Sequence, residues 1–584
     1  MASEISLENV LRKCNDLGRY QIIHYIFLNL ITIGSGITTY YYVFGVAENS
    51  YRCRLPGNIW LDDDQYESKN STHQYLINQW QKISKCNDYN DTICTSFVYD
   101  RNTFGRTFTE EGDFVCQNKL KKTWLSTMYQ VGGFVVLLSG YICDRIGRRK
   151  MIRILTITLF IVPCFTQLIL QTVEMNINTN IDILAKKNDS TIARWHRVFQ
   201  YNSKLIHGIK ISYFRFILLA INQFFSSVDA YPMVFLLLME LTSSSHTSLA
   251  GNSALIGFTI GEIIITLFAY IARDWLRLKW IITCYFALIL PYLYFVPESP
   301  YWLFSKKKYN QLEEYLRKIA QRNGRSDNEW YPLYRKLICD PRLAILSTKH
   351  ASRTNKEVIL QHLPRLAMCA FIGFLTMLLY IKISYGLAAM SDVVSPYWNI
   401  IIGAIVEGFG YISASILITT KLGRKHSLIL YTLFTCLCVF TIPFTMTSYP
   451  IVTIIISQIG KFTISGAVSI TWIFIPEIFP TSTRGIANGI FVFSGRIGAI
   501  LAPVVDVALG SEYIKITFYV YSAFTIIQII LIHFLPETRN RSFHTDEDEE
   551  NDKVNPIEIL NETMNRSIPA ILRNNRVDIS HTRF

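Results

Sequence analysis

The chain has 584 residues, of which 50% are apolar, 14% are aromatic and only 17% are charged. Soluble domains carry about 25% charged residues, so this composition indicates a protein with many membrane spans. The formal net charge of +13 would also suit a nucleic-acid binder. Much of the Lys and Arg, however, lies in short loops beside apolar segments, as the positive-inside rule requires. We therefore expect the lipid bilayer, and no nucleic acid, as a partner.

Residues 1–19 are polar and precede an apolar segment that is long enough to cross a bilayer. We predict a cytoplasmic N-terminus without a cleavable signal peptide, followed by a first half of six spans within residues 20–296.

Two polar inserts in this half, 48–121 and 172–209, are expected outside the cell. The first insert contains the cysteines Cys53, Cys86, Cys94 and Cys116. Four cysteines in an extracellular loop suggest two disulfides, with three possible pairings. N-glycosylation sequons begin at Asn70, Asn90 and Asn188, whereas two further sequons, at Asn561 and Asn565, fall in the predicted cytoplasmic tail.

A basic hairpin fixes the orientation of the predicted spans. The uncharged run Trp124–Ile142 leads into the sequence Gly140-Tyr-Ile-Cys-Asp144-Arg145-Ile-Gly147-Arg148-Arg149-Lys150. Clusters of Lys and Arg beside a span stay on the cytoplasmic side. The hairpin is therefore predicted to be cytoplasmic.

Residues 297–364 form a long polar segment between the two predicted halves. Within it, Tyr309–Arg322 places Leu312, Leu316 and Ile319 on one face of a helix. We predict an amphipathic helix that lies on the inner membrane surface and tethers the halves.

The second half, 365–535, repeats the landmarks of the first in the same order. Gly423-Arg424-Lys425 corresponds to Gly147-Arg148-Arg149, Glu477 to Glu240, and Glu537 to Glu298. The sequence therefore predicts an all-α membrane protein with 12 transmembrane helices in two six-helix halves. Residues 536–584 form a tail, and both termini are expected in the cytoplasm. In parallel repeats of this kind, substrate binds between the halves near the membrane midplane.

Several motifs resemble those of known transporters. The hairpin from Gly140 to Lys150 is similar to the loop after the second helix of major facilitator superfamily transporters. Pro297-Glu-Ser-Pro-Tyr301-Trp-Leu, Gly460-Lys461-Phe462, Glu477-Ile-Phe-Pro-Thr481 with Arg484, and Leu535-Pro-Glu-Thr538 resemble the organic cation, organic anion and carnitine transporters of that superfamily, with an invertebrate-like member as the expected type.

This resemblance implies the major facilitator fold and assigns the loop motifs to gating. The implied gating residues are Asp144, Arg145, Gly147, Arg148, Glu240, Glu298, Glu477, Arg484 and Glu537. They are expected to make cytoplasmic salt bridges that form and break as the halves rock. The chain departs from the family pattern at Tyr301, at Thr420 and around Ser245-His246-Thr247, where the family has charged residues.

Charged residues inside predicted spans are the candidates for substrate contact. A charge at the bilayer centre costs about 2.5–3.5 kcal/mol on insertion scales, so it normally faces the bundle interior and has a partner. We single out Arg215, Glu262, Lys382, Glu407, Lys461 and Arg496. Arg215 is interpreted as a structural anchor, and Glu262 has no partner that the sequence identifies.

Two of these charges correspond to cavity positions of the family. Glu407 resembles an acidic residue of the eighth span, where it would attract a substrate ammonium. Arg496 lies where anion and carnitine relatives have Arg and cation relatives have Asp, and a guanidinium can hold a carboxylate bidentately. The alternative is a structural ion pair between Glu407 and Arg496.

The remaining cavity candidates are two lysines and two tyrosines. The resemblance places Lys461 at a basic position of the tenth span, whereas Lys382 is either a private substrate contact or an interface residue. Tyr385 and Tyr231 could face a quaternary ammonium through cation–π attraction, or could simply pack in the core.

Three cavity cations against one cavity acid favour a zwitterion over a simple cation as substrate. We predict a secondary transporter of organic cations or carnitine-like zwitterions, with an organic anion transporter as the first alternative and a non-transporting receptor as the second. An ion that couples to transport is possible, and the plasma membrane is the expected location. The sequence has no nucleophile elbow, P-loop or metal-ligand spacing, so we expect no enzyme activity, cofactor or metal.

Overall fold

The structure is a computed structural model that describes most of the chain between residues 6 and 538. The described ranges are 6–56, 59–60, 63–83, 94, 96–116, 119–185, 213–243, 246–339, 363–389, 395–446, 448–479, 481–509 and 513–538, without the side chains of 119–120, 174–185, 385–389, 481–486 and 507. Eleven of the described helices are long and apolar enough to cross a membrane.

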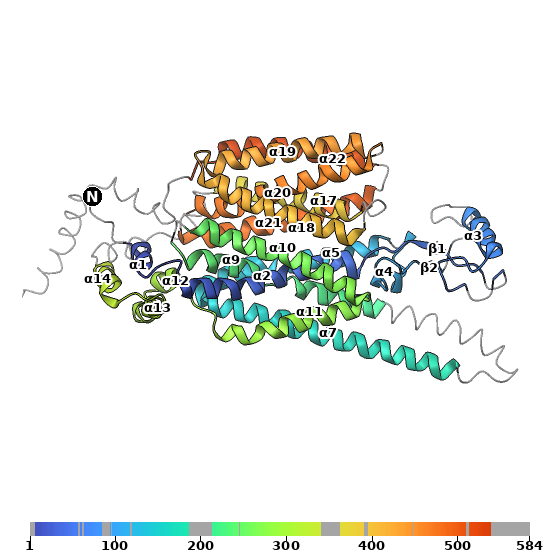
Figure 1. Ribbon diagram of the computed structural model, residues 1–584, viewed down its shortest axis with the longest axis horizontal. Coiled ribbons are helices and arrows are strands. Elements are labelled where there is room, and N and C mark those ends of the chain that lie inside the picture. The colour runs from blue at the N-terminus through green and yellow to red at the C-terminus, as the bar shows by residue number, and fades with distance from the viewer. Residues whose placement is uncertain are drawn as a thin grey trace, which may run out of the picture.

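The helices form two bundles that lie side by side (Figure 1). The first half contains α2 (Arg19–Gly45), α5 (Lys119–Gly132), α6 (Val135–Ile146), α7 (Arg148–Ala185), α9 (Tyr231–Glu240), α10 (Thr247–Ala272) and α11 (Trp275–Ile289), which η2 (Leu290–Tyr294) extends. The second half contains α17 (Leu363–Ala389), α18 (Pro396–Thr419), α19 (Gly423–Thr445), α20 (Pro450–Ile478), α21 (Thr481–Leu509) and α22 (Ile514–Phe534).

The predicted fourth span, residues 212–241, is interrupted rather than continuous. Residues 213–226 are helical, residues 227–230 are not, and α9 then begins with Pro232 in its first turn. Proline is accommodated at the start of a helix but not in its interior, so the helix restarts here. The short stretch between the two pieces carries Asp229.

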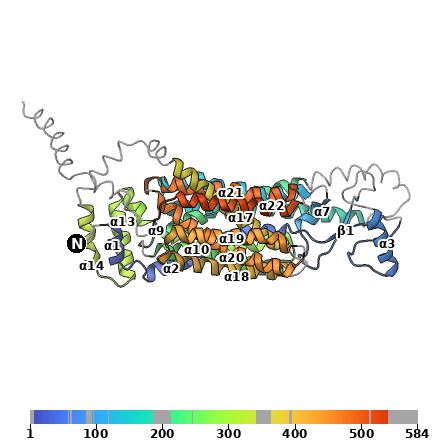
Figure 2. The same cartoon turned by 90° about the horizontal axis from the view of Figure 1, so that it is seen from above.

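Two contacts join the halves. On one side α10 packs along α18, and on the other α21 packs against α5 and α6 (Figures 1 and 2). Within the first half, α2 and α10 approach closely because both present glycine. A Cβ on Gly36 would lie 2.2 Å from the carbonyl oxygen of Phe258.

The predicted amphipathic helix is α13, with the same bounds Tyr309–Arg322, but its surroundings differ from the prediction. Its apolar residues Leu312, Leu316 and Ile319 are buried in a small core formed with α1 (Leu7–Lys13), α12 (Pro300–Ser305) and α14 (Asp327–Ile338). Protein, rather than the membrane surface, covers this face. These four helices lie beyond one end of the bundle (Figure 1), which we call the linker end.

A small polar unit lies beyond the opposite end, which we call the loop end (Figure 1). It contains β1 (Tyr51–Cys53), which pairs antiparallel with β2 (Phe97–Tyr99), together with α3 (Ser71–Ile83) and α4 (Phe108–Glu111). A disulfide joins Cys53 to Cys94, and Cys116 is also disulfide-bonded. Cys86, Asn90 and Asn188 lie outside the described residues.

Candidate transport site

A buried cluster of charges connects the two halves. Lys461 of α20 lies between two carboxylates, with its Nζ 3.2 Å from Oε2 of Glu262 on α10 and 3.0 Å from Oε2 of Glu407 on α18. All three side chains are at most 3% exposed. Glu262 belongs to the first half and the other two belong to the second, so the ion pair crosses the interface. We call these three residues the central cluster.

Tyrosine hydroxyls complete the central cluster. Tyr380 of α17 and Tyr411 of α18 donate to the same oxygen of Glu407, Oε1, at 2.9 and 2.6 Å. The ring of Tyr40 on α2 lies 5.7 Å from Lys461 Nζ. Glu407 therefore accepts two tyrosine hydroxyls at Oε1 and forms its ion pair with Lys461 through Oε2, and it does not pair with Arg496 as the structural alternative had it.

Arg496 of α21 lies apart from the central cluster and faces the first half. Its Nη1 donates to Gln130 of α5 at 3.1 Å, which is its one side-chain hydrogen bond in the described chain. Its charge also acts on Asp229, the acid in the interrupted fourth span. The half-buried guanidinium thus keeps N–H groups that a ligand carboxylate could accept.

Aromatic rings occupy the space between the halves. Tyr231 lies edge-on to Trp472 with ring centroids 5.8 Å apart, and to Phe258 at 6.1 Å. Trp472 also contacts Phe235 at 5.3 Å and Phe491 at 5.7 Å. Tyr231 lies within electrostatic range of Asp229, Glu407 and Arg496, so this aromatic cluster lies near both charged groups.

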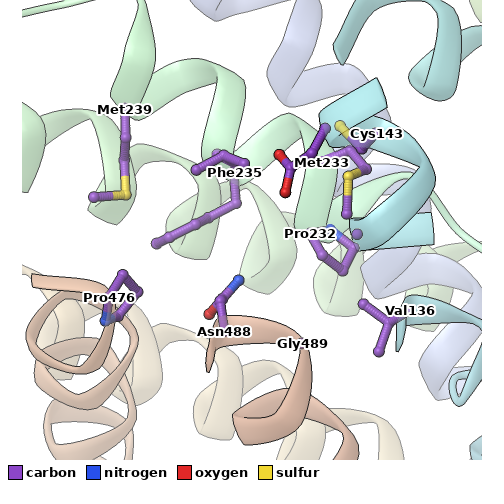
Figure 3. Close-up of a pocket in the computed structure, with 12 residues that line it drawn as sticks. Val136, Cys143, Pro232, Met233, Phe235, Met239, Pro476, Asn488 and Gly489 are labelled. Carbon is purple, nitrogen blue, oxygen red and sulfur yellow. The ribbon is translucent and has the colours of Figure 1, made fainter. Parts of the chain in front are cut away.

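A cleft opens between the halves at the linker end (Figure 3). The first half contributes residues of α6 and α9, including Cys143, Met233 and Phe235. The second half contributes Pro476 of α20 and Asn488 of α21. The cleft is mostly apolar, and its wall continues into the aromatic cluster through Phe235.

In the part of the chain that the structure describes, a side chain of the second half reaches across to the first half at the loop end. Tyr397 of α18 stacks on Phe44 of α2 at 5.4 Å and meets Tyr270 of α10 edge-on at 5.6 Å. Its hydroxyl donates to the carbonyl oxygen of Thr103 at 3.1 Å. The structure is therefore closed across the halves at the loop end and has its cleft at the linker end.

The loop motifs of the first half form a compact network at the linker end. Arg148 Nε lies 3.0 Å from Glu240 Oε2, and Arg148 Nη2 lies 3.1 Å from Asp144 Oδ1. Glu298 accepts from the backbone N–H groups of Arg148 and Arg149, at the N-terminus of α7. Helix N-termini favour anions through such free backbone N–H groups. Burial nevertheless raises the pKa of Glu298.

The second half repeats this network with its own residues. Arg424 Nε lies 2.5 Å from Glu477 Oε2, and Glu537 accepts from the backbone N–H groups of Arg424 and Lys425 at the N-terminus of α19. Gly147 and Gly423 both have positive φ, 103° and 73°. Gly147 lies against the carboxylate of Glu298, and Gly423 lies against that of Glu537.

The structure adds two features to these networks. Each lies within one half, and Glu298 and Glu537 accept hydrogen bonds from backbone N–H groups. Arg145 takes no part in the described network, because its guanidinium lies over Tyr141. The side chain of Arg484 lies outside the described residues.

Other predicted charges have local partners. Lys382 pairs with Asp506 and lies 4.5 Å from the ring of Phe518, so it does not join the central cluster. Arg215 pairs with Glu111 of the loop-end unit and lies over Trp275, which agrees with an anchor. The side chain of Tyr385 lies outside the described residues.

Sequence reasoning missed three intramembrane charges. Asp229, Lys279 and Asp506 all fall within predicted spans, so the rule that selected the other six applied to them equally. Their inclusion changes the charge count. Each of the three predicted cavity cations, Lys382, Lys461 and Arg496, faces an acid. The premise of three cavity cations against one cavity acid is therefore wrong.

Two bundles related by a repeat, a cleft between them and paired charges across the interface define a membrane transporter of the major facilitator type. The chain matches the family described as "Sugar (and other) transporter" over residues 243–548, more than half of its length, and it belongs to that family. The predicted all-α major facilitator fold is thereby confirmed, with eleven candidate spans in the described chain, whereas the cytoplasmic position of both termini stays a prediction. The structure of the proton:xylose symporter XylE bound to 6-bromo-6-deoxy-D-glucose has the same fold, with a TM-score of 0.60 at 15% identity over 90% of this chain and 98% of that one.

Curated relatives have names that concern organic ions. The chain is 25% identical to organic cation transporter 1 of Caenorhabditis elegans, over 91% of this chain and 86% of the relative. It is 24% identical to organic cation/carnitine transporter 2 of Homo sapiens, with 89% of each chain covered. The mouse protein solute carrier family 22 member 4 is 25% identical, over 77% of this chain and 73% of the relative. These relatives agree with the predicted membership, and the family is one of transporters, not enzymes.

Proposed function

We propose that the chain transports small organic ions that carry an ammonium group, either organic cations or carnitine-like zwitterions, by alternating access across the plasma membrane. The observation that carries the proposal is the arrangement of charges around the aromatic cluster. Tyr231 lies within electrostatic range of Glu407 and also of Arg496 and Asp229. Aromatic faces attract quaternary ammonium groups, and a guanidinium with spare N–H groups suits a carboxylate.

The corrected charge count strengthens the ammonium part of this proposal. The three cavity cations Lys382, Lys461 and Arg496 lie beside four acids, Glu262, Glu407, Asp229 and Asp506, so these cations do not leave an excess of positive charge against a positive ligand. The carboxylate part rests on Arg496 alone. The names of the relatives, which include organic cations and carnitine, support the same substrate class.

An organic anion remains the second candidate, and Arg496 is the observation that favours it. Against it stand Asp229 next to that arginine and the acids of the central cluster, because a lone anion would meet them without a compensating charge. A receptor without transport activity has less support, since each half has an Arg–Glu ion pair at the linker end.

Uptake into expressing cells tests the proposal. Three labelled probes are compared: a carnitine-like zwitterion, a quaternary ammonium ion and an aromatic carboxylate. Wild type is expected to accumulate the zwitterion or the cation. Arg496→Lys keeps the charge but loses the planar fork, so it should raise KM for the zwitterion more than for the cation.

Arg496→Asp is the sharper variant, with surface biotinylation as the control for protein amount. It should abolish zwitterion uptake or shift preference to the cation. Uptake of the aromatic carboxylate alone by wild type would favour the organic anion candidate. Equal loss of all probes with normal surface protein in Arg496→Lys would contradict a carboxylate role for Arg496.

A further inference from the structure

The central cluster has one more negative charge than positive charge when all its groups are ionised. Glu262 and Glu407 supply two carboxylates, Lys461 supplies one ammonium, and none of the three reaches solvent appreciably. An uncompensated charge in a protein interior costs several kcal/mol. A fully ionised central cluster would therefore be unfavourable inside this interface.

The groups that face Glu262 from the neighbouring helices do not remove the excess. The helices α2, α18, α20 and α17 present one or two polar or charged groups each. These groups are Tyr40, Glu407 with Tyr411, Lys461 and Tyr380, whereas Tyr231 of α9 interacts with Glu407. Lys461 is the one cation among them, and it is shared between the two acids.

Hydrogen-bond geometry distinguishes the two acids. The single hydroxyl proton of Tyr380 goes to Glu407 Oε1 at 2.9 Å, and the same hydroxyl oxygen lies 3.5 Å from Glu262 Oε1. For the contact between the Tyr380 hydroxyl oxygen and Glu262 Oε1 to be a hydrogen bond, a second proton must lie between these two oxygens. Only the carboxyl group of Glu262 can supply that proton. The buried hydroxyl of Tyr40, 3% exposed, also approaches Glu262.

We propose that Glu262 is a proton-binding site, and that the halves come together around the central cluster with a proton on this carboxyl group. The protonated Glu262 donates to Tyr380 or Tyr40, while Glu407 stays ionised with Lys461, so the closed cluster is neutral. When the halves separate at this level, Glu262 leaves Lys461 and meets water, where the proton can be released. The Glu407–Lys461 pair stays neutral within the second half.

A consequence for turnover follows, and it rests on the proposed transport function. Closure of the halves around the central cluster needs the proton, so uptake should fall as the medium becomes alkaline. Glu262→Gln is a permanently neutral replacement of nearly the same shape. Its uptake should be nearly independent of pH and should exceed that of wild type at alkaline pH.

The proton itself can be detected without any substrate. Purified protein is studied by infrared difference spectroscopy, which records the C=O stretching band of a protonated carboxyl group. Wild type minus Glu262→Gln should show this band at neutral pH. Glu407→Gln should lose it too, because one carboxylate and one ammonium then balance and Glu262 ionises. Asp506→Asn removes the acid of a one-to-one pair and should keep the band.

The outcomes separate this inference from the proposed function. Absence of the band from wild type, or its persistence in Glu262→Gln, overturns the proton site whether or not the protein transports anything. A band that disappears in Glu262→Gln and Glu407→Gln but not in Asp506→Asn supports it, even if all three uptake probes fail. An uptake profile with the same pH dependence in wild type and Glu262→Gln overturns the coupling to closure.

Discussion

Lys461 Nζ lies 3.2 Å from Glu262 Oε2, and this ion pair links α20 of the second half to α10 of the first. Rocking of the halves must separate these two residues if it opens the interface at this depth. Lys461 also contacts Glu407 within its own half, so it keeps a partner when Glu262 moves away. The lysine can therefore serve both the joined and the separated arrangement.

Replacement of Lys461 by Met should destabilise the protein strongly. The buried acids Glu262 and Glu407 would then have no cation beside them, and breaking a buried ion pair costs about 3–5 kcal/mol. The additional change Glu407→Gln should recover part of the loss, because it removes the carboxylate that Lys461→Met leaves unpaired. Thermal unfolding of both variants in detergent measures this coupling, which we expect at about 1–3 kcal/mol. Strictly additive effects would contradict the shared role of Lys461.

Replacement of Tyr397 by Ala should weaken closure at the loop end. Each aromatic pair contributes about 0.5–1.5 kcal/mol, so loss of the contacts with Phe44 and Tyr270 should raise the open population several-fold. The measurement is labelling of a Thr39→Cys reporter by an impermeant maleimide. Trp398→Ala is the matched control, since Trp398 is 62% exposed and should leave labelling unchanged. Equal labelling in both variants would argue against Tyr397 as the closing residue.

Asp63 should be essential to the loop-end unit, whereas its neighbour Asp64 should not. Asp63 forms a buried ion pair with Arg52, so Asp63→Asn should cost about 3–5 kcal/mol. The exposed Asp64 pairs with Arg54, and Asp64→Asn should cost at most about 1 kcal/mol. Limited proteolysis of the loop-end unit distinguishes the two variants. Similar cleavage rates would show that burial of the Arg52 pair does not matter.

The same carboxylate gives a pH dependence. Burial would raise the pKa of Asp63, but the bonds from Arg52 and from the Leu55 N–H hold that pKa below its ordinary value of 3.8. A lowered pKa in the folded state stabilises the fold above the ordinary value, and this stability is lost as pH falls through the lowered one. Protease resistance should therefore persist in mildly acidic medium and fail only below about pH 4. Loss of resistance well above that pH would contradict an ionised, paired Asp63.

Gly147→Ala should be more damaging than Gly324→Ala, although both glycines have positive φ. At Gly147, with φ 103° and ψ 157°, a Cβ would lie 2.5 Å from a carboxylate oxygen of Glu298, whereas nothing lies within 4 Å at Gly324. Backbone conformations of the first kind are nearly exclusive to glycine and cost about 1–3 kcal/mol for other residues. Thermal stability and turnover should both fall in Gly147→Ala. Equal losses of thermal stability and turnover in the two variants would show that the contact with Glu298 does not affect either property.

The orientation in the membrane can be tested through glycosylation. Asn70 is exposed beside α3, and its side-chain oxygen accepts from the backbone N–H of His73 at 2.8 Å. Thr72→Ala removes the sequon but keeps that hydrogen bond, so the protein should migrate faster on gels without unfolding. Asn565→Gln, in the predicted cytoplasmic tail, should cause no change. A shift with Asn565→Gln instead would reverse the predicted orientation.

The halves and their networks could be predicted because their signals are local. The spacing of Arg148, Glu240 and Glu298 recurs at Arg424, Glu477 and Glu537, and both sets meet as compact networks. The bounds of α13 followed equally from the period of its apolar residues. What covers that apolar face did not, because the partner helices α1 and α14 lie far from it in sequence.

The central cluster could be predicted only in part. Intramembrane charge identified Glu262, Glu407 and Lys461 one at a time, but their pairing depends on how α10, α18 and α20 pack. No local signal shows that packing. Tyr397 gave no signal either, since one more aromatic residue at a span end is common in such proteins. The rule for charges within spans could have identified Asp229. Its place in the interrupted fourth span shows that short polar stretches within a predicted span should also be examined as candidate sites.

Counterflow by the purified protein in liposomes tests the central claim most directly. Vesicles are loaded with an unlabelled carnitine-like zwitterion or quaternary ammonium ion and diluted into trace amounts of the labelled compound. The account predicts transient accumulation of label in vesicles with wild-type protein and none in empty vesicles, because alternating access exchanges substrate without an imposed gradient of any coupling ion. Absence of counterflow for both compounds, with protein that is folded and correctly inserted, would contradict transport of ammonium-bearing organic ions.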